Sequence, residues 1–202
     1  MPTLEPVCKR LFSNQPSVVK CLVGGVLLMI PVAHFLAFGL LFALIDQARR
    51  GQNPELPSWS GWRRLFADGV VAFVIFLVLG AAPICAGWIL SWPLRALAIG
   101  PLRFLPLIPG VLLAAPLTAA GIYRYQSRKG FGAAFQLAEL AGMLQSSREG
   151  ILLPTLALLG FVLVGYPLMS ITLFFGLAGA FTFYAMCFRM IEESRKGGAR
   201  SP

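Results

Sequence analysis

The run GILLPTLALLGFVLVGYPLMSITLFFGLAGAFTFYAMCF, from Gly150 to Phe188, decides the fold class, because its 39 residues contain no Asp, Glu, Lys or Arg. A single helix of that length would reach roughly 58 Å at about 1.5 Å per residue. A bilayer's hydrocarbon core is only about 30 Å thick, and roughly 20 apolar residues cross it. We therefore expect two membrane-spanning helices in this run.

The break between these two helices has two candidate positions. Gly165, Tyr166 and Pro167 form the favoured one, because proline removes a backbone donor and clashes with the preceding turn. The segment 176–179, which begins and ends with glycine, is the alternative. In that case Pro167 would only kink one long helix.

Three further runs without charged side chains predict one span each, at Cys21–Ile45, Val70–Trp92 and Phe104–Tyr123. Backbone polar groups cannot stay unpaired in lipid, so these spans should be helical. Pro31 lies near the middle of the first span and leaves two forms open, a kinked spanning helix or a re-entrant segment. The sequence thus predicts an all-α integral membrane protein with about five transmembrane helices.

Composition supports the same fold class. Of the 202 residues, 57% are hydrophobic and 12% are charged, whereas soluble domains have about 45–50% apolar and about 25% charged residues. These values exclude a soluble globular domain and a disordered chain. Four cysteines are ordinary usage and exclude a disulfide-rich scaffold. No run alternates apolar and polar residues, which excludes an outer-membrane barrel.

The distribution of cations predicts the orientation. With five spans, the segments 47–68 and 124–150 and the tail hold twelve Lys and Arg residues on one side, and the other side holds five. The positive-inside rule then places the C-terminus in the cytoplasm. A re-entrant first segment would change the split to fifteen against two. The net charge of +9 requires no nucleic acid, since anionic lipid headgroups attract such cations.

Two connecting segments predict interfacial amphipathic helices. In residues 51–68, GQNPELPSWSGWRRLFAD, the three rings of Trp59, Trp62 and Phe66 fall at i, i+3 and i+7, with Arg63 and Arg64 nearer the opposite side. An aromatic face beside cations is typical of a helix at the membrane surface. Membrane anchoring is the simpler interpretation, and a docking surface for a partner is the functional one.

The second segment, residues 130–147, has a wide apolar surface and a thin polar strip of Gln136, Glu139 and Met143. This pattern predicts a helix lying flat against the end of the bundle. The expected organisation is an N-terminal interfacial segment at residues 1–20, a helical membrane domain at 21–190 and a basic cytoplasmic tail at 191–202.

The stretch GGVLLMIPVAHFLAFGLLFALIDQARRGQNPELPSWSGWRRLFADGVVAFVI resembles a prokaryotic membrane family catalogued as a domain of unknown function. Its loop carries PELPxW followed by LFxDG. The matching residues are Pro54, Glu55, Leu56, Pro57 and Trp59, then Leu65, Phe66, Asp68 and Gly69. The FGAAFQ stretch, 131–136, is similar to the family's amphipathic segment. The resemblance covers roughly residues 15–195 and implies a multi-span protein of a prokaryotic cytoplasmic membrane, with no catalytic residue to carry over.

His34 is the one ionisable residue deep in a predicted span. Ionisable groups inside a membrane are functional candidates, and an imidazole there could be an axial ligand of a porphyrin or chlorin. The simpler interpretation is a neutral ring bonded to the carbonyl of Ile30 or Leu27. The sequence names no other cofactor.

No catalytic or metal-binding pattern accompanies His34. The cysteines are isolated, the carboxylates lie beside arginines, and phosphate-loop, GxSxG, HExxH and GxGxxG motifs are absent from the sequence. We therefore expect a non-enzymatic accessory, scaffold or assembly subunit, with partner subunits or further copies of itself. The alternative is a small oligomeric transporter or channel, because Pro31, Pro83, Pro116 and Pro167 interrupt spans.

Overall fold

The computed structural model describes residues 9, 11, 15–53, 55–56, 61–95, 100–164 and 169–198. These residues form helices and turns, and no strand occurs among them. Three helical stretches are long and apolar enough to cross a membrane: Trp62–Leu94, Leu102–Arg128 and Ser170–Ser194. The predicted all-α membrane fold is confirmed, with shorter apolar helices beside these three.

The first predicted span, Cys21–Ile45, is divided at Pro31 into two helices, where the sequence leaves a kinked helix or a re-entrant segment open. Helix α2 covers Gln15–Met29 and helix α3 covers His34–Arg49. Pro31 lies in the turn between them, where Val32 has a positive φ of 73°. Proline and left-handed backbone both end a helix, which explains the division.

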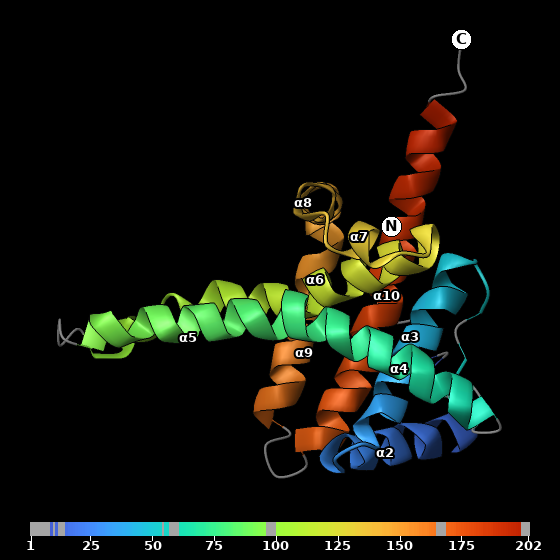
Figure 1. Cartoon of the computed structure of the whole chain (residues 1–202), viewed down its shortest axis with the longest axis horizontal. Helices are drawn as coiled ribbons and strands as arrows, with labels where there is room; N and C mark the ends of the chain where they lie inside the picture. The colour runs from blue at the N-terminus through green and yellow to red at the C-terminus, as the bar shows by residue number, and fades with distance from the viewer. Residues whose placement is uncertain are drawn as a thin grey trace.

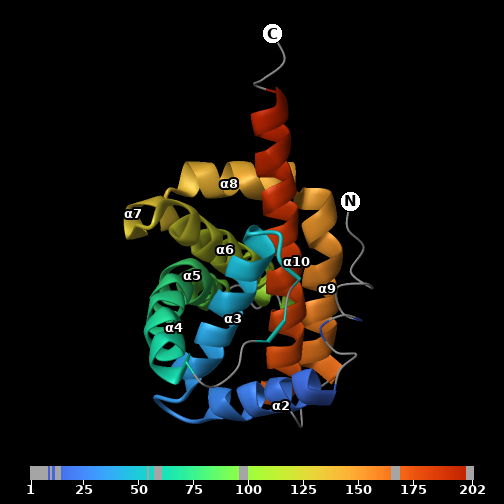
Figure 2. The same cartoon turned by 90° about the vertical axis from the view of Figure 1, so that its right-hand side faces the viewer.

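Helix α2 lies across the ends of α3 and α10 (Met169–Gly198) rather than in line with α3 (Figure 2). Two glycines allow this close crossing. A Cβ on Gly24 would collide with the Phe174 ring, and one on Gly25 would collide with the Ile171 backbone. Lys20 donates a hydrogen bond of 2.8 Å to the carbonyl of Leu56 and ties α2 to the connection after α3.

The long charge-free run forms two helices, as predicted. Helix α9 covers Arg148–Val164, and α10 begins at Met169. The favoured break at Gly165, Tyr166 and Pro167 lies outside the described residues. Helix α10 continues without interruption through 176–179, so the alternative break there is wrong.

Helix α10 forms the centre of the bundle, beside α3 and α9 (Figures 1 and 2). Its rings at Phe174, Phe181, Tyr184 and Phe188 are almost fully buried. The Tyr184 hydroxyl lies 2.7 Å from Thr155 Oγ1 of α9. Because lipid tails are as apolar as these rings, the close packing of the rings, and not their removal from water, stabilises the bundle.

Helices α4 (Trp62–Phe76) and α5 (Ala82–Arg95) form one rod, joined by the π-helical turn η2 (Leu77–Ala81). The amide of Ala82 donates to the carbonyl of Leu77, five residues earlier. Pro83 follows at once and has no amide hydrogen. The wider turn fits the point where the ordinary helical bonding is interrupted.

Helix α5 and the first half of α6 (Leu107–Arg128) extend away from the bundle as an arm, with the 3₁₀ turn η3 (Gly100–Phe104) near its tip (Figure 1). The two helices approach closely at glycines, where a Cβ on Gly87 would lie 2.6 Å from the carbonyl oxygen of Pro106 and a Cβ on Gly110 would lie 2.7 Å from that of Pro83. Only 28% of the most apolar part of Trp62–Leu94 is buried, against 67% for Ser170–Ser194. The arm therefore presents much apolar surface.

The predicted flat helix of residues 130–147 is present as two pieces, α7 (Phe131–Ala134) and α8 (Leu137–Ser146). Figure 2 shows α8 lying across the end of the bundle opposite α2. Its buried face differs from the predicted one, because Met143 is buried and Leu137 is 66% exposed. The side of α8 that carries Glu139 and Met143 faces α6 and α10 instead of solvent, which the pattern of polar residues did not indicate.

Candidate functional site

The polar end of the bundle gathers charged side chains from four helices. Asp46 near the end of α3 pairs with Arg49 and Arg50, both at 2.7 Å. On α6, Gln126 Nε2 donates to the carbonyl of Phe42 at 2.8 Å and joins α6 to α3. Arg49 and Arg50 therefore share this end with residues 124–139 (Figure 1). Arg63 and Arg64 do not, because they begin α4, whose Phe66 packs on Phe35 near the opposite end of α3. The predicted orientation in the membrane stays a prediction.

The Asp46 carboxyl is held in its charged form. Burial alone would raise its pKa, but hydrogen bonds and positive charge from Arg49 and Arg50 outweigh burial and lower that pKa below its ordinary value. All three groups remain partly exposed to solvent, so each ion pair stabilises the fold by no more than about 1 kcal/mol.

Arg124 organises the next layer of this end. Its side chain is only 12% exposed. It donates to the carbonyl of Ala133 at 3.0 Å and to Gln136 Oε1 at 2.6 Å, and it pairs with Glu139 at 3.3 Å. Nearby, the Tyr123 hydroxyl donates to Glu192 at 2.9 Å. The first set of bonds ties α7 and α8 to α6, and the second ties α6 to α10.

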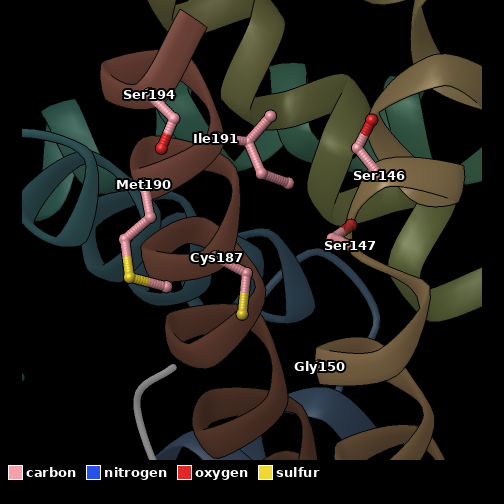
Figure 3. A pocket seen from close by; sticks show the side chains of 7 residues that line it. All are labelled: Ser146, Ser147, Gly150, Cys187, Met190, Ile191 and Ser194. Carbon is pink, nitrogen blue, oxygen red and sulfur yellow. The ribbon is translucent and has the colours of Figure 1, made fainter. Parts of the chain in front are cut away.

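Two cavities lie between these helices. The larger has a volume of about 340 Å³ and opens between the α8–α9 corner and α10 (Figure 3). The smaller has a volume of about 160 Å³ and lies between α6, α8 and α10. Ile191 lines both cavities. Together the two cavities form the candidate site: the larger is lined mainly by apolar side chains, and the smaller by charged ones.

The walls of the larger cavity are mainly apolar. Figure 3 shows Cys187 and Ile191 on the side of α10 nearer the chain between α8 and α9, with Met190 farther round the helix. Gly150 leaves room on the opposite wall, since a Cβ there would lie 3.3 Å from Cys187 Sγ. The Ser147 hydroxyl donates its hydrogen to the carbonyl of Met143 at 2.7 Å. That hydrogen is therefore not available to a molecule in the cavity.

His34 lies at the first position of α3, close to the turn, and not near the middle of a spanning helix. Its ring centroid is 4.1 Å from that of Phe35 and 4.9 Å from that of Phe73. Its Nε2 atom is buried, with no hydrogen-bond partner among the described residues. A porphyrin or chlorin metal would reach that nitrogen only if the surrounding rings moved. Its role as an axial ligand stays a prediction.

The predicted docking surface is only partly described. Trp59 lies outside the described residues. Trp62 is 56% exposed, and the Arg63 guanidinium lies 5.5 Å from its ring centroid. Phe66 instead turns towards α3, with its ring centroid 5.4 Å from that of Phe35. Arg64 is exposed and lies 3.6 Å from Asp68. Trp62 is therefore exposed while Phe66, one turn further along α4, packs against α3. Docking here stays a prediction.

The segment containing Leu65 and Gly69 has a clear packing role. A Cβ on Gly69 would collide with the carbonyl of Phe35, and one on Gly39 would collide with the carbonyl of Leu65. The two helices α3 and α4 therefore cross at backbone contact distance. Leu65 itself is buried.

Comparison with known protein families decides the relationship. Residues 22–174 match the family described as "Protein of unknown function (DUF4013)". The chain belongs to the DUF4013 family. No curated protein and no solved structure gave a significant match. The resemblance inferred from the sequence is thus confirmed for the family, and DUF4013 membership assigns no activity to the polar end described above.

Sequence reasoning missed the two cavities of this DUF4013 protein. Arg124 and Arg128 served only to predict orientation, and Glu139 only as part of a polar strip. Tyr123 and Glu192 lie 69 positions apart, and no spacing rule connects them. The available signal was the placement of Arg124, Arg128 and Glu139 within 16 positions of one another, on α6 and α8 with only the short helix α7 between them. No group of three or more potential metal ligands occurs within the described parts of the chain.

Proposed function

We propose that this DUF4013 protein is a non-enzymatic accessory, scaffold or assembly subunit of a complex in a prokaryotic cytoplasmic membrane, with its C-terminus in the cytoplasm. The observation that carries the proposal is the arm formed by α5 and the first half of α6. It leaves the bundle (Figure 1), and its large apolar side chains at Trp88, Ile89, Trp92 and Ile108 are 44% to 65% exposed.

An arm of this kind favours association over isolated function. In lipid, helices associate through close packing of small residues, and Gly87 and Gly110 already hold the arm together in this way. The bundle does not cover the outer faces of these helices. We infer that a spanning helix of a partner subunit or of a second copy packs there, with lipid filling the rest.

Photocrosslinking in living cells tests this function. A photoreactive amino acid at Ile89 on the arm should give a discrete crosslinked protein band. The matched control is Leu153 on α9, an apolar side chain that is 63% exposed on the bundle. Crosslinks to lipid alone from Ile89, together with a monomer in native mass spectrometry after mild extraction, would contradict the accessory role.

A transporter or channel is the second candidate, favoured by the turn at residues 30–33 and the π-helical turn at Leu77–Ala81. Interrupted helices are common at transporter binding sites, and π-helical turns often occur at functional sites. Proteoliposomes loaded with potassium-sensitive and proton-sensitive dyes distinguish the candidates. Flux above that of empty vesicles, lost in His34→Ala, would favour transport, and its absence would favour the accessory role.

A further inference from the structure

We propose that the two cavities beside Ile191 together bind one anionic phospholipid. An acyl chain occupies the larger cavity and the phosphodiester lies in the smaller one, against Arg128. This inference rests on the cavities and the charges around them, and it is independent of the accessory role and of the arm.

The larger cavity suits a hydrocarbon chain. Its volume of about 340 Å³ falls at the lower end of the range of about 300–1,000 Å³ for small-molecule sites. Cys187, Met190 and Ile191 supply most of its apolar wall (Figure 3). The hydroxyl of Ser146 donates to the carbonyl of Gly142 at 2.8 Å, as that of Ser147 does to Met143. These bonds reduce the cost of placing the two serines against a chain.

The smaller cavity suits a phosphate because one of its cations has no internal partner. Arg124 is already bonded to three acceptors, and the two carboxylates in the cavity, Glu139 and Glu192, are held by Arg124 and Tyr123. The Arg128 side chain is exposed and makes no ion pair within the described residues. A guanidinium is well matched to phosphate oxygens.

The surrounding charges favour an anionic lipid. Lys129 and Arg148 are also exposed, and they too make no ion pair within the parts of the chain that the structure describes. Glu149 is the one exposed carboxylate beside them without a described partner. Glu192 also keeps its negative charge, because its bond from the Tyr123 hydroxyl does not neutralise it. Three cations thus face two carboxylates, and the remaining positive charge attracts a negatively charged headgroup.

The depth of the site in the membrane is also appropriate. The cavities contact α10 between Cys187 and Ser194, and the charge-free run of α10 ends there, at Phe188. Phospholipid phosphates lie just beyond the hydrocarbon core, at the ends of spanning helices. A chain in the larger cavity would therefore enter from the hydrocarbon side while its phosphate stays at the surface.

Native mass spectrometry of the full-length, delipidated protein in detergent tests the proposal, with phosphatidylglycerol, phosphatidylcholine and diacylglycerol as probes. We expect phosphatidylglycerol to bind most tightly, with one copy per chain, and diacylglycerol most weakly. Arg128→Gln should lower the affinity for phosphatidylglycerol about fivefold, and Arg128→Lys should retain most of it. Ser194→Phe, at the exposed rim of the larger cavity, should reduce binding of both phospholipids.

Arg50→Gln is the matched control, because Arg50 is an exposed arginine at the same end of the protein that lines neither cavity. It should leave binding unchanged. Equal affinity for diacylglycerol and phosphatidylglycerol would overturn the phosphate assignment. An unchanged affinity for phosphatidylglycerol in Arg128→Gln would overturn the proposal that the lipid binds in these cavities. Arg128 lies on the surface, so this variant tests the proposal even if Ser194→Phe does not fold.

Discussion

The backbones of Gly39 and Gly69 meet where α3 crosses α4: a Cβ placed on Gly69 would lie 2.9 Å from the backbone nitrogen of Gly39. The same Cβ would collide with the carbonyl of Phe35. The crossing therefore requires glycine at both positions, and it brings Phe66 and Phe73 of α4 against the start of α3.

Gly69→Ala should separate these two helices. We expect the variant to lower the free energy of unfolding by about 1–3 kcal/mol, because the added methyl group meets rigid backbone. Thermal unfolding in detergent measures the effect. The control is Gly160→Ala in α9, where a Cβ meets nothing within 4 Å and higher helix propensity should raise stability by up to about 1 kcal/mol. Equal behaviour of the two variants would contradict the tight crossing.

Arg124→Gln should release α7 and α8 from α6. The guanidinium supplies all of the bonds described above to Ala133, Gln136 and Glu139, and a shorter neutral side chain cannot reach them together. Hydrogen exchange of residues 131–146 should become faster, while that of α10 stays slow. Arg128→Gln in lipid-free detergent is the control on the same helix and should leave exchange unaltered. Unchanged protection in Arg124→Gln would show that packing of Leu140 and Met143 is sufficient.

Asp46 should make stability depend on acidity. Its pKa is lowered in the folded protein, so its stabilising effect is fully present above the pKa of the unfolded chain. The effect is lost as the pH falls through the lower folded value. Asp46→Asn should reduce stability at neutral pH and flatten the acid limb of a plot of melting temperature against pH. Glu149→Gln, which changes an exposed carboxylate, should retain the wild-type profile.

Val32→Gly should stabilise the protein. A β-branched residue at φ 73° is strained, and glycine adopts this conformation freely, so a gain of about 1 kcal/mol is expected. Val19→Gly, in the body of α2, should instead lower stability by a similar amount because glycine is a poor helix former. Both changes are read from thermal unfolding, and a loss in Val32→Gly would mean that the turn at residues 30–33 is not strained.

The helical membrane fold could be predicted because charge-free runs follow directly from the thickness of the bilayer. The separation of α9 from α10 followed from the same length argument. The division at Val32 was harder to predict, because Pro31 is compatible with a kink, a turn or a re-entrant segment. Tertiary contacts with Phe174 and Ile171, far along the chain, fix the position of α2, and local sequence does not contain them.

The candidate site could not be predicted from the sequence either, because it also depends on tertiary contacts. Helical spacing predicted Met143 beside Glu139, and both do line the smaller cavity, but spacing did not show that this side of α8 faces α6 and α10. The cavities depend on how α8 crosses α10, which no residue pattern determines. His34 stood out because it is the single histidine of the chain, but only the structure shows that the Phe73 ring of another helix packs against it.

The rod formed by α4, η2 and α5 has a consequence for the kind of membrane that suits this protein. The helix Trp62–Leu94 contains 33 residues, and its charge-free part from Gly69 to Leu94 corresponds to roughly 39 Å of helix at about 1.5 Å per residue. Lipid tails cover only about 30 Å, and such hydrophobic mismatch is relieved by strong tilting or by local thickening of the bilayer. The free energy of placing this rod in the bilayer therefore depends on the length of the lipid acyl chains. Thick and thin membranes should favour different tilts of the rod.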